Sequence, residues 1–419
     1  MMMRNLLARS PPSRLGTIAV VALILAASAI YAVGKEPLSG DFRYYYGGGD
    51  ALLAGHPEDL YRTGGLGFRY LPFLALYMAP VAMLPPQVAT FVWVLLEACA
   101  IVVILWVVLR AIFEGEAGIA FLAVLVAAAP DAINNLHLGQ INLHAAAWAF
   151  LGLLLAHSGR QACGGALLGL GAAIKFWPAL VLLGAIVARR PRIALGGVAA
   201  FLIFAALLPS VVLGWGHHAD LVSTYLHSAR GKLVDPEREQ VVGQSLQTIL
   251  QRYLSGNPYQ IHDGAPRAHT PHLDLPPETT ALIGAVVAAS LLVVVLTWFA
   301  VRPARETLGR LLDVGILVAL WLLLSPETRN AQFLLLAWPW ACWVRVLEKG
   351  EVPGRARLLM QVLAVLYFLE TTIVHKGVLG RELVEHLNGH VLQGWTLLLF
   401  TASLLLLRFL RRPLPEQAP

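Results

Sequence analysis

The sequence predicts an all-α, polytopic membrane protein, and three observations support this prediction. The chain has 419 residues, of which 58% are hydrophobic and only 13% are charged. Soluble globular proteins carry about 25% charged residues, and a large core cannot account for the difference. Several apolar runs are long enough to cross a hydrocarbon core of about 30 Å as helices. These runs are continuous and do not alternate with polar residues, which favours helices over barrel strands.

Ten apolar segments are expected to span the membrane, and two further segments bring the expected total to about 11–13 transmembrane helices. The segment 70–86 is short and contains prolines, so it either spans or re-enters the membrane. The segment 164–190 is apolar on both sides of Lys175 and Pro178. A proline inside a helix costs about 3 kcal/mol, so we expect one kinked helix or two half-helices. The ten spans are 16–33, 87–109, 118–130, 141–156, 194–214, 279–301, 311–324, 332–344, 358–374 and 391–408.

Basic residues in the short loops predict the orientation of the chain. The N-terminal run resembles a signal peptide, but we expect a retained first helix because many further spans follow. With the N-terminus inside, 70–86 re-entrant and 164–190 a hairpin, the short basic loops all face the cytoplasm, and we prefer this arrangement for that reason. We therefore expect an integral protein of the cell (inner) membrane with a cytoplasmic segment (1–15), one transmembrane domain (16–412) and a cytoplasmic tail (413–419). The first outer loop (34–69) and a large outer loop (215–278) then lie outside, and the part of the large loop rich in Gly, Pro and His (252–278) is expected to be irregular.

Asp41 is the first candidate for chemistry, because it follows the outer end of the first apolar helix. A loop aspartate is usually a helix cap or a solvated carboxylate. Its neighbours weigh against that reading: Tyr44 and Tyr45 suit a membrane interface, and the glycines 47–49 permit close approach of a ligand or a helix. The net charge of +6 lies in short loops and does not indicate a nucleic-acid partner.

Lys175 is the second candidate, because an ionisable residue between apolar half-helices is by default a functional-site hypothesis. The alternative is that its side chain reaches the membrane interface. Other polar candidates lie on the expected outer loops: His137, Gln140, Asn142, Gln244, Arg252, Arg329 and Gln332. For Gln140, Asn142 and Gln244, hydrogen bonding between helices is an equally good explanation.

These residues predict an active-site cavity on the outer face. A cation beside hydrocarbon suits a lipid-borne phosphate, and a carboxylate beside water suits a general base or a ligand of sugar hydroxyls. The outer loops contain no Asp-x-Asp or Glu-x-Asp pair, so we expect neither a metal nor another cofactor. The combination predicts transfer of a group from a lipid phosphate to a polar acceptor.

Six segments in order resemble glycosyltransferase family 87 of the GT-C superfamily. They are GDFRYYYGGGDALLAGHPEDLY, FRYLPFLALYMAPVAMLP, LGQIN, AAIKFWPALVLL, GQSLQTILQR and LLLSPETRNAQF, and they run from residue 40 to residue 333. Each is weak alone, and their order carries the resemblance. It implies a GT-C-type bundle and an alpha-mannosyltransferase that uses polyprenyl-phosphate mannose.

The resemblance also implies roles for particular residues. Asp41 matches a first-loop aspartate that acts as the catalytic base, and Lys175 matches a lysine near the donor phosphate. Gln140 and Asn142 match an element that lines the cavity. The family often has a histidine after Ser-Pro, but this chain has Gln332 in that segment and no histidine. Arg329 therefore becomes the expected phosphate contact there, together with Arg252.

The expected function is thus inverting transfer of a hexose, mannose first, to a hydroxyl of an envelope glycolipid or glycan. Its partners are a polyprenyl-phosphate sugar, that acceptor and the bilayer. Tyr44, Tyr45, His137, Gln140, Asn142, Gln244 and Gln332 are the expected substrate contacts. A GT-C enzyme with a glucose, arabinose or aminoarabinose donor is the close alternative. A lipid or polysaccharide transporter and a structural subunit of an envelope complex are alternatives from other classes.

Overall fold

A computed structural model describes most of the chain. The described residues are 14–61, 68–116, 118–234, 243–255, 259–260, 266–267, 273–326, 328–374 and 376–412. They form two compact units, which are considered one at a time. The first unit comprises Met1–Ala117 and Ala132–Ser228, and the second comprises Gly118–Asp131 and Ala229–Pro419. Most of the expected cytoplasmic ends, 1–13 and 413–419, lie outside the described residues.

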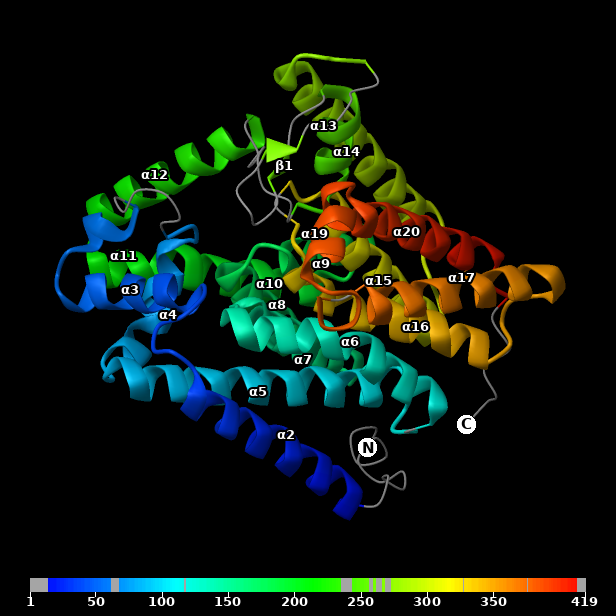
Figure 1. Cartoon of the computed structure of the whole chain (residues 1–419), viewed down its shortest axis with the longest axis horizontal. Coiled ribbons are helices and arrows are strands. Elements are labelled where there is room, and N and C mark those ends of the chain that lie inside the picture. The colour runs from blue at the N-terminus through cyan, green and yellow to red at the C-terminus, as the bar shows by residue number, and fades with distance from the viewer. Residues whose placement is uncertain are drawn as a thin grey trace. The chain divides into compact units, whose positions relative to one another are not determined.

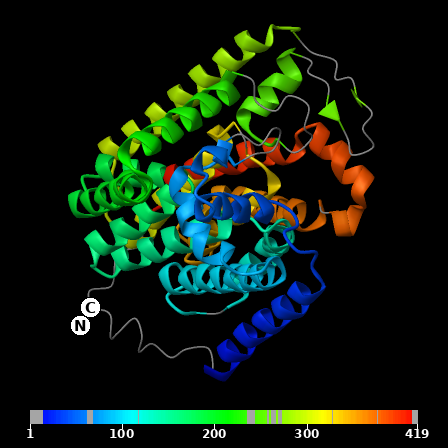
Figure 2. The same ribbon diagram turned by 90° about the vertical axis from the view of Figure 1, so that its left-hand side faces the viewer.

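The first unit is built from helices, some of them only a few turns long (Figure 1). Helix α2 lies beside α5, as Figures 1 and 2 both show. Helix α8 packs against both α7 and α10. The elements are α2 (Arg14–Gly34), α3 (Phe42–Leu53), η1 (Pro57–Tyr61), α4 (Pro72–Ala82), α5 (Pro86–Ala111), the end of α6 (Ile119–Leu138), α7 (Asn142–His157), α8 (Gln161–Ile174), α9 (Pro178–Val187), α10 (Pro191–Leu202), η2 (Ile203–Leu207), α11 (Leu208–Leu213) and most of α12 (Trp215–Val234).

The second unit is also helical, and its described strands are a single two-residue antiparallel pair. Helix α20 packs against α15, α16 and α17. The elements are α13 (Leu246–Ser255), β1 (Tyr259–Gln260), β2 (Pro266–Arg267), α14 (Pro277–Val301), α15 (Thr307–Leu324), η3 (Asn330–Leu336), α16 (Ala337–Glu348), α17 (Gly354–Ile373), α18 (Lys376–Leu379), α19 (Arg381–Gly389) and α20 (Leu392–Leu410).

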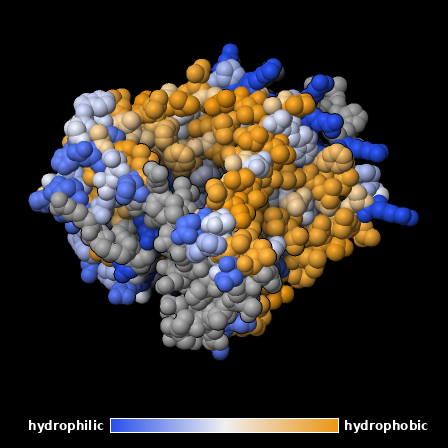
Figure 3. Space-filling view, turned by 90° about the horizontal axis from the view of Figure 1, so that it is seen from above, coloured by the Kyte–Doolittle hydropathy of each residue, from blue (hydrophilic) through white to orange (hydrophobic). Residues whose placement is uncertain are grey.

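The structure confirms an all-α chain with several membrane-spanning helices. Seven helices of the described part are long and apolar enough to cross a bilayer: Pro86–Ala111, Ile119–Leu138, Pro191–Leu213, Pro277–Val301, Thr307–Leu324, Gly354–Ile373 and Leu392–Leu410. Five shorter apolar helices accompany them. Wide orange, hydrophobic areas cover the face seen in Figure 3. Large apolar side chains such as Val293 and Val211 are more than half exposed, as expected where lipid is the solvent.

Both ambiguous segments have a definite form in the structure. The segment 164–190 consists of two helices, α8 and α9, which are separated at Lys175–Trp177, as one of the two alternatives predicted. In the segment 70–86, α4 has 11 residues, about 17 Å of helix, which is too short to cross a hydrocarbon core alone.

Two segments that we expected to be loops contain helices. The first outer loop includes the 12-residue helix α3, which runs through the three glycines. The large loop 215–278 includes α12 and α13. Helix α13 ends at Ser255, so the irregular form expected for 252–278 is wrong for residues 252–255. Amphipathic helices of this kind gain their stability from packing, which outweighs a poor intrinsic propensity.

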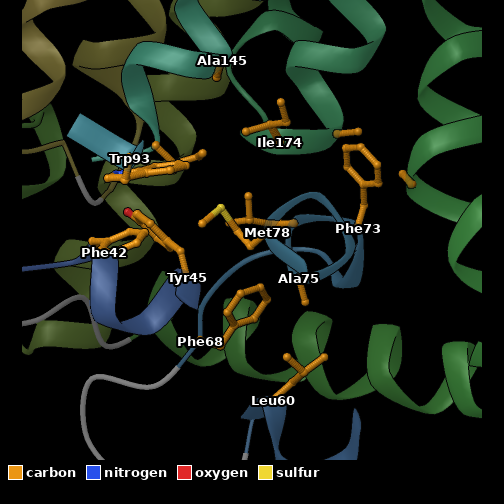
Figure 4. Packing of buried hydrophobic residues seen from close by; sticks show 14 of the residues in the cluster. Phe42, Tyr45, Leu60, Phe68, Phe73, Ala75, Met78, Trp93, Ala145 and Ile174 are labelled. Carbon is orange, nitrogen blue, oxygen red and sulfur yellow. The ribbon is translucent and has the colours of Figure 1, made fainter. Parts of the chain in front are cut away.

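A buried cluster joins α3 to α4, α5, α7 and α8 (Figure 4). Phe42 and Tyr45 of α3 lie beside Trp93 of α5, and Met78 of α4 lies close to them. Gly49 explains how closely α3 approaches α4, because a Cβ at this position would lie 3.0 Å from the backbone of Met78. Gly49 therefore accommodates a neighbouring helix in this structure. The cluster fixes the start of α3, where Asp41 lies.

Candidate active site

Asp41 is held by main-chain contacts between two loops. It is the N-cap residue of α3, and its backbone N–H donates a hydrogen bond to the carbonyl oxygen of Leu138 (2.7 Å). Gly139 adopts a left-handed conformation (φ +66°), and a Cβ there would lie 2.8 Å from Cβ of Phe42. Only glycine takes this conformation without strain and fits this space. The first loop and the loop before α7 are therefore fixed against each other at the backbone.

Four of the predicted residues form one continuous series of hydrogen bonds, which we call the polar chain: Asp41, Gln140, Asn142 and Lys175. Gln140 Nε2 donates to Asp41 Oδ2, and Asn142 Nδ2 donates to Gln140 Oε1 (3.1 Å). At the other end, Lys175 Nζ donates to Asn142 Oδ1. The two amides are only 7% and 3% exposed, whereas Asp41 and Lys175 are half-buried. A carboxylate and an ammonium thus lie at opposite ends of a buried pair of neutral amides.

The break between α8 and α9 places Lys175. The residue is the C-cap of α8 with an extended backbone (φ −149°, ψ 129°), and Pro178 opens α9 three residues later. The side chain therefore leaves the helix axis instead of facing lipid. Its Nζ lies 5.9 Å from the ring centroid of Tyr70, which is within the range of a cation–π interaction.

Aromatic side chains surround the polar chain. Trp93 stacks on His144 with ring centroids 4.4 Å apart and on Phe42 with centroids 5.2 Å apart. The hydroxyls of Tyr45 and Tyr70 are 3.2 Å apart. Burial raises the pKa of the Tyr45 hydroxyl well above its ordinary value, and Tyr70 and Asp41 raise it further. Tyr45 is therefore neutral at physiological pH and contributes a hydroxyl instead of a charge.

Two further predicted residues of this unit, Tyr44 and His137, make their side-chain contacts with residues outside the polar chain. Tyr44 pairs with Arg43, whose guanidinium lies 4.6 Å from the ring centroid and donates to the hydroxyl. His137 is exposed, and its Nδ1 lies 3.1 Å from the hydroxyl of Tyr31. Neither side chain has a described hydrogen bond to a member of the polar chain.

The other predicted residues belong to the second unit. Gln244 is fully buried; its Nε2 donates to the carbonyl of Asn388 (3.3 Å), and its Oε1 accepts from the N–H of Gly394 (2.9 Å). These contacts match the alternative that Gln244 joins helices. Arg252 is 2% exposed on α13. Arg329 is the N-cap of η3, and its carbonyl accepts from the N–H of Gln332 (2.9 Å). Glu327, two residues before Arg329 in the sequence, lies outside the described residues.

Sequence reasoning missed several residues around the polar chain. Asn135 Oδ1 lies 3.5 Å from Asn142 Nδ2. Asn135 belongs to the polar end of a helix whose first half is apolar, a signal that could have found it. Trp93 and Tyr70 carry no such signal, because aromatic residues are common in membrane helices and at their ends. His144 is buried, and the hydroxyl of Tyr77 lies 2.9 Å from its Nδ1.

A helical membrane bundle in which two buried amides join a half-buried carboxylate to a half-buried lysine contains a candidate functional site. The comparison with protein families gives the particular class. The sequence model described as Glycosyltransferase family 87 matches residues 68–326, which is more than half of the chain, and the chain belongs to this family. It is therefore a membrane glycosyltransferase.

The matched range divides the predicted residues. Gln140, Asn142, Lys175, Gln244 and Arg252 lie within it, whereas Asp41, Arg329 and Gln332 lie outside it. A search of the curated proteins found no significant match, and neither did a search of the solved structures. The case for Asp41 thus rests on its contacts with Gln140 and Leu138.

Proposed function

We propose that this protein transfers a hexose, mannose first, from a polyprenyl-phosphate donor to a hydroxyl of an envelope glycolipid or glycan on the outer face of the membrane. Asp41 acts as the general base, and Lys175 binds the donor phosphate. The observation that carries the proposal is the polar chain, which links a half-buried carboxylate to a half-buried ammonium. The choice of mannose rests on the resemblance described from the sequence.

The two ends of the polar chain suit two different substrates. A carboxylate at the start of a loop helix is accessible to a hydroxyl that arrives from water. A lysine between two apolar half-helices is accessible to a phosphate whose tail lies in lipid. The intervening amides of Gln140 and Asn142 are neutral, so they separate the two charges without adding one.

The reaction follows as a single inverting displacement. Asp41 accepts the proton of the acceptor hydroxyl, and the hydroxyl oxygen forms a bond to the anomeric carbon. The bond between that carbon and the phosphate oxygen breaks on the opposite face, and polyprenyl phosphate leaves with the electron pair. A beta-linked donor thus yields an alpha-linked product. Lys175 stabilises the charge that develops on the leaving phosphate, as fixed cations do elsewhere.

The test compares wild type with Asp41→Asn and Asp50→Asn in nanodiscs. Asp50 lies on the same helix and is exposed, so its substitution is a matched control for the change in charge. Each protein receives a panel of radiolabelled polyprenyl-phosphate sugars and a membrane-lipid acceptor pool. Loss of a general base typically slows a reaction about 10²–10⁴-fold, so we expect that loss for Asp41→Asn and near wild-type rates for Asp50→Asn.

The same panel separates the alternatives. Transfer from the mannose donor supports the proposal, whereas transfer from glucose, arabinose or aminoarabinose donors alone would replace mannose with that sugar. Equal rates for wild type and Asp41→Asn would remove Asp41 from its catalytic role. Donor binding is measured separately, and retained binding by Asp41→Asn shows that this variant is folded.

A further inference from the structure

A basic pocket lies in the second unit, and none of its lining residues belongs to the polar chain. It has a volume of about 380 Å³. It lies where α14 ends (Val301), where α15 begins (Thr307) and where α20 ends (Leu410). All three helices are long and apolar enough to cross a bilayer, so the pocket lies at the level of a membrane surface. Its lining residues are Val301, Arg302, Pro303, Ala304, Arg305, Glu306, Arg408 and Arg411.

Two of its four arginines are fixed by ion pairs. Arg411, whose side chain is only 3% exposed, bridges Glu306 and Glu351. Arg408 Nε binds Asp313 Oδ1 (2.7 Å). Arg408 also donates to the carbonyl of Arg302 (3.1 Å). Each of the two guanidiniums therefore has more than one contact. Arg408 and Arg411 are thus fixed in place, and nearby carboxylates largely neutralise their positive charge.

Arg302 and Arg305 supply the charge that is not neutralised. Both are exposed on the connection between α14 and α15. Among the residues that the structure describes, neither guanidinium has a hydrogen bond or an ion pair. An arginine offers a planar set of donors that matches phosphate oxygens. Two such side chains on one pocket therefore provide the donors and the charge that a phosphate needs.

Apolar side chains flank the same pocket. Val301, which lines it, is 72% exposed, and Phe409, which follows the lining residue Arg408 in the chain, is 66% exposed. The guanidinium of Arg408 lies 5.8 Å from the ring centroid of Trp298, near the end of α14. Tryptophan at the end of a spanning helix is typical of the headgroup region. The surroundings thus combine cations with surfaces that suit acyl chains.

We propose that this pocket binds the phosphate of a phosphate ester at the membrane surface, at a site distinct from the proposed donor phosphate site at Lys175. The same chemistry is available from an anionic phospholipid headgroup and from a soluble phosphate. Basic pockets between membrane helices bind lipid headgroups in this way. The inference does not depend on the proposed reaction, because none of its residues takes part in it.

The test measures ligand binding to the purified full chain in a neutral detergent. Short-chain phosphatidylglycerol, phosphatidylcholine, glycerol 3-phosphate and inorganic phosphate are titrated separately, and the apparent melting temperature is followed. The pocket variant is Arg302→Gln with Arg305→Gln. The control is Arg189→Gln with Arg192→Gln, which removes the same charge from exposed arginines at the start of α10. A third variant, Ala304→Trp, fills the pocket and keeps every charge.

We expect phosphatidylglycerol, but not phosphatidylcholine, to stabilise the wild type and the control saturably. Each basic residue at a membrane surface contributes about a fivefold factor, so the pocket variant should bind about 20-fold more weakly. Ala304→Trp should weaken binding as well. Equal stabilisation by glycerol 3-phosphate or inorganic phosphate would identify a soluble ligand; stabilisation by the lipid alone would identify the headgroup. Unchanged binding in both pocket variants, or no response of the wild type to any phosphate, would overturn the proposal.

Discussion

Asn142 lies at the centre of the polar chain and makes contacts in both directions. Its amide oxygen accepts from Lys175, and its amide nitrogen donates to Gln140. Only a neutral amide can serve both neighbours in this arrangement. An aspartate has the same shape but no donor, and its charge would pair with the lysine.

We therefore expect Asn142→Asp to weaken donor binding more than it slows chemistry. A carboxylate beside Lys175 competes with the donor phosphate, so the KM for the donor should rise about tenfold, which corresponds to about 1.4 kcal/mol. Steady-state kinetics with varied donor checks this. Asn134→Asp, which adds the same charge on α6, serves as the control. An unchanged KM would show that Lys175 does not bind the phosphate.

A second prediction at the scale of single residues concerns Glu306 and the pH dependence of stability. Burial opposes ionisation of its carboxyl, but a backbone hydrogen bond and the guanidinium of Arg411 outweigh it and lower the pKa below 4.5. A lowered pKa in the folded state means stability that is fully present above pH 4.5 and is lost as the pH falls through the folded value.

The difference in apparent melting temperature between wild type and Glu306→Gln should therefore be largest near neutral pH and should shrink below pH 4.5. Thermal unfolding in detergent at several pH values measures it. Glu278→Gln, at the exposed start of α14, is a suitable comparison. A difference that grows as the pH falls would show that the ion pair with Arg411 does not stabilise the fold.

At the scale of elements, the contact between the start of α3 and the loop before α7 controls the position of Asp41. Gly139→Ala would force a Cβ into the space of Phe42 and a left-handed conformation on alanine, which costs about 1–2 kcal/mol. Transfer activity should fall at least about tenfold through displacement of Asp41 by a fraction of an ångström, while the membrane helices still fold.

Gly34→Ala is the matched control for this substitution, because nothing lies within 4 Å of the added Cβ and its backbone is not left-handed. Activity and apparent melting temperature are measured together for both variants. Wild-type activity in Gly139→Ala would mean that the loops adjust without moving the carboxylate.

The break between α8 and α9 was predictable, and helix α3 was not. Lys175 and Pro178 interrupt an apolar run, and each is costly inside a membrane helix. In α3, by contrast, three consecutive glycines argue locally against a helix. The reason for Gly49 lies in α4, whose backbone would lie 3.0 Å from an added Cβ, and the reason for Gly48 lies in the side chain of Phe68. No local pattern contains that information.

The candidate site likewise has a part that the sequence predicts and a part that it does not. Its polar members could be predicted because charged and amide groups are rare in an apolar chain. The hydrogen bonds that join Asp41 to Lys175 could not, because they depend on side-chain directions that only the packed helices determine. The substrate contacts expected of Tyr44 and His137 stay predictions; their pairing with Arg43 and Tyr31 could not be read from the sequence for the same reason.

For the whole molecule, the expected topology places the first loop outside and the basic loop near residue 355 inside. Single cysteines at Asp50 and Arg355, both exposed, test this in a background that lacks Cys99, Cys163 and Cys342. A membrane-impermeant maleimide should label Asp50→Cys in intact cells that express the protein, and Arg355→Cys only after the cells are permeabilised. The reverse pattern would contradict the proposed outer-face site.

The anchoring of Asp41 through its backbone has a consequence for how such an enzyme can diversify. Its N–H donates to the carbonyl oxygen of Leu138, and this contact between main-chain atoms does not use the exposed side chains of α3. Changes in the exposed residues of α3 can therefore reshape the surface offered to an acceptor and leave the carboxylate in place. A single reaction geometry could in this way serve many acceptors across related chains.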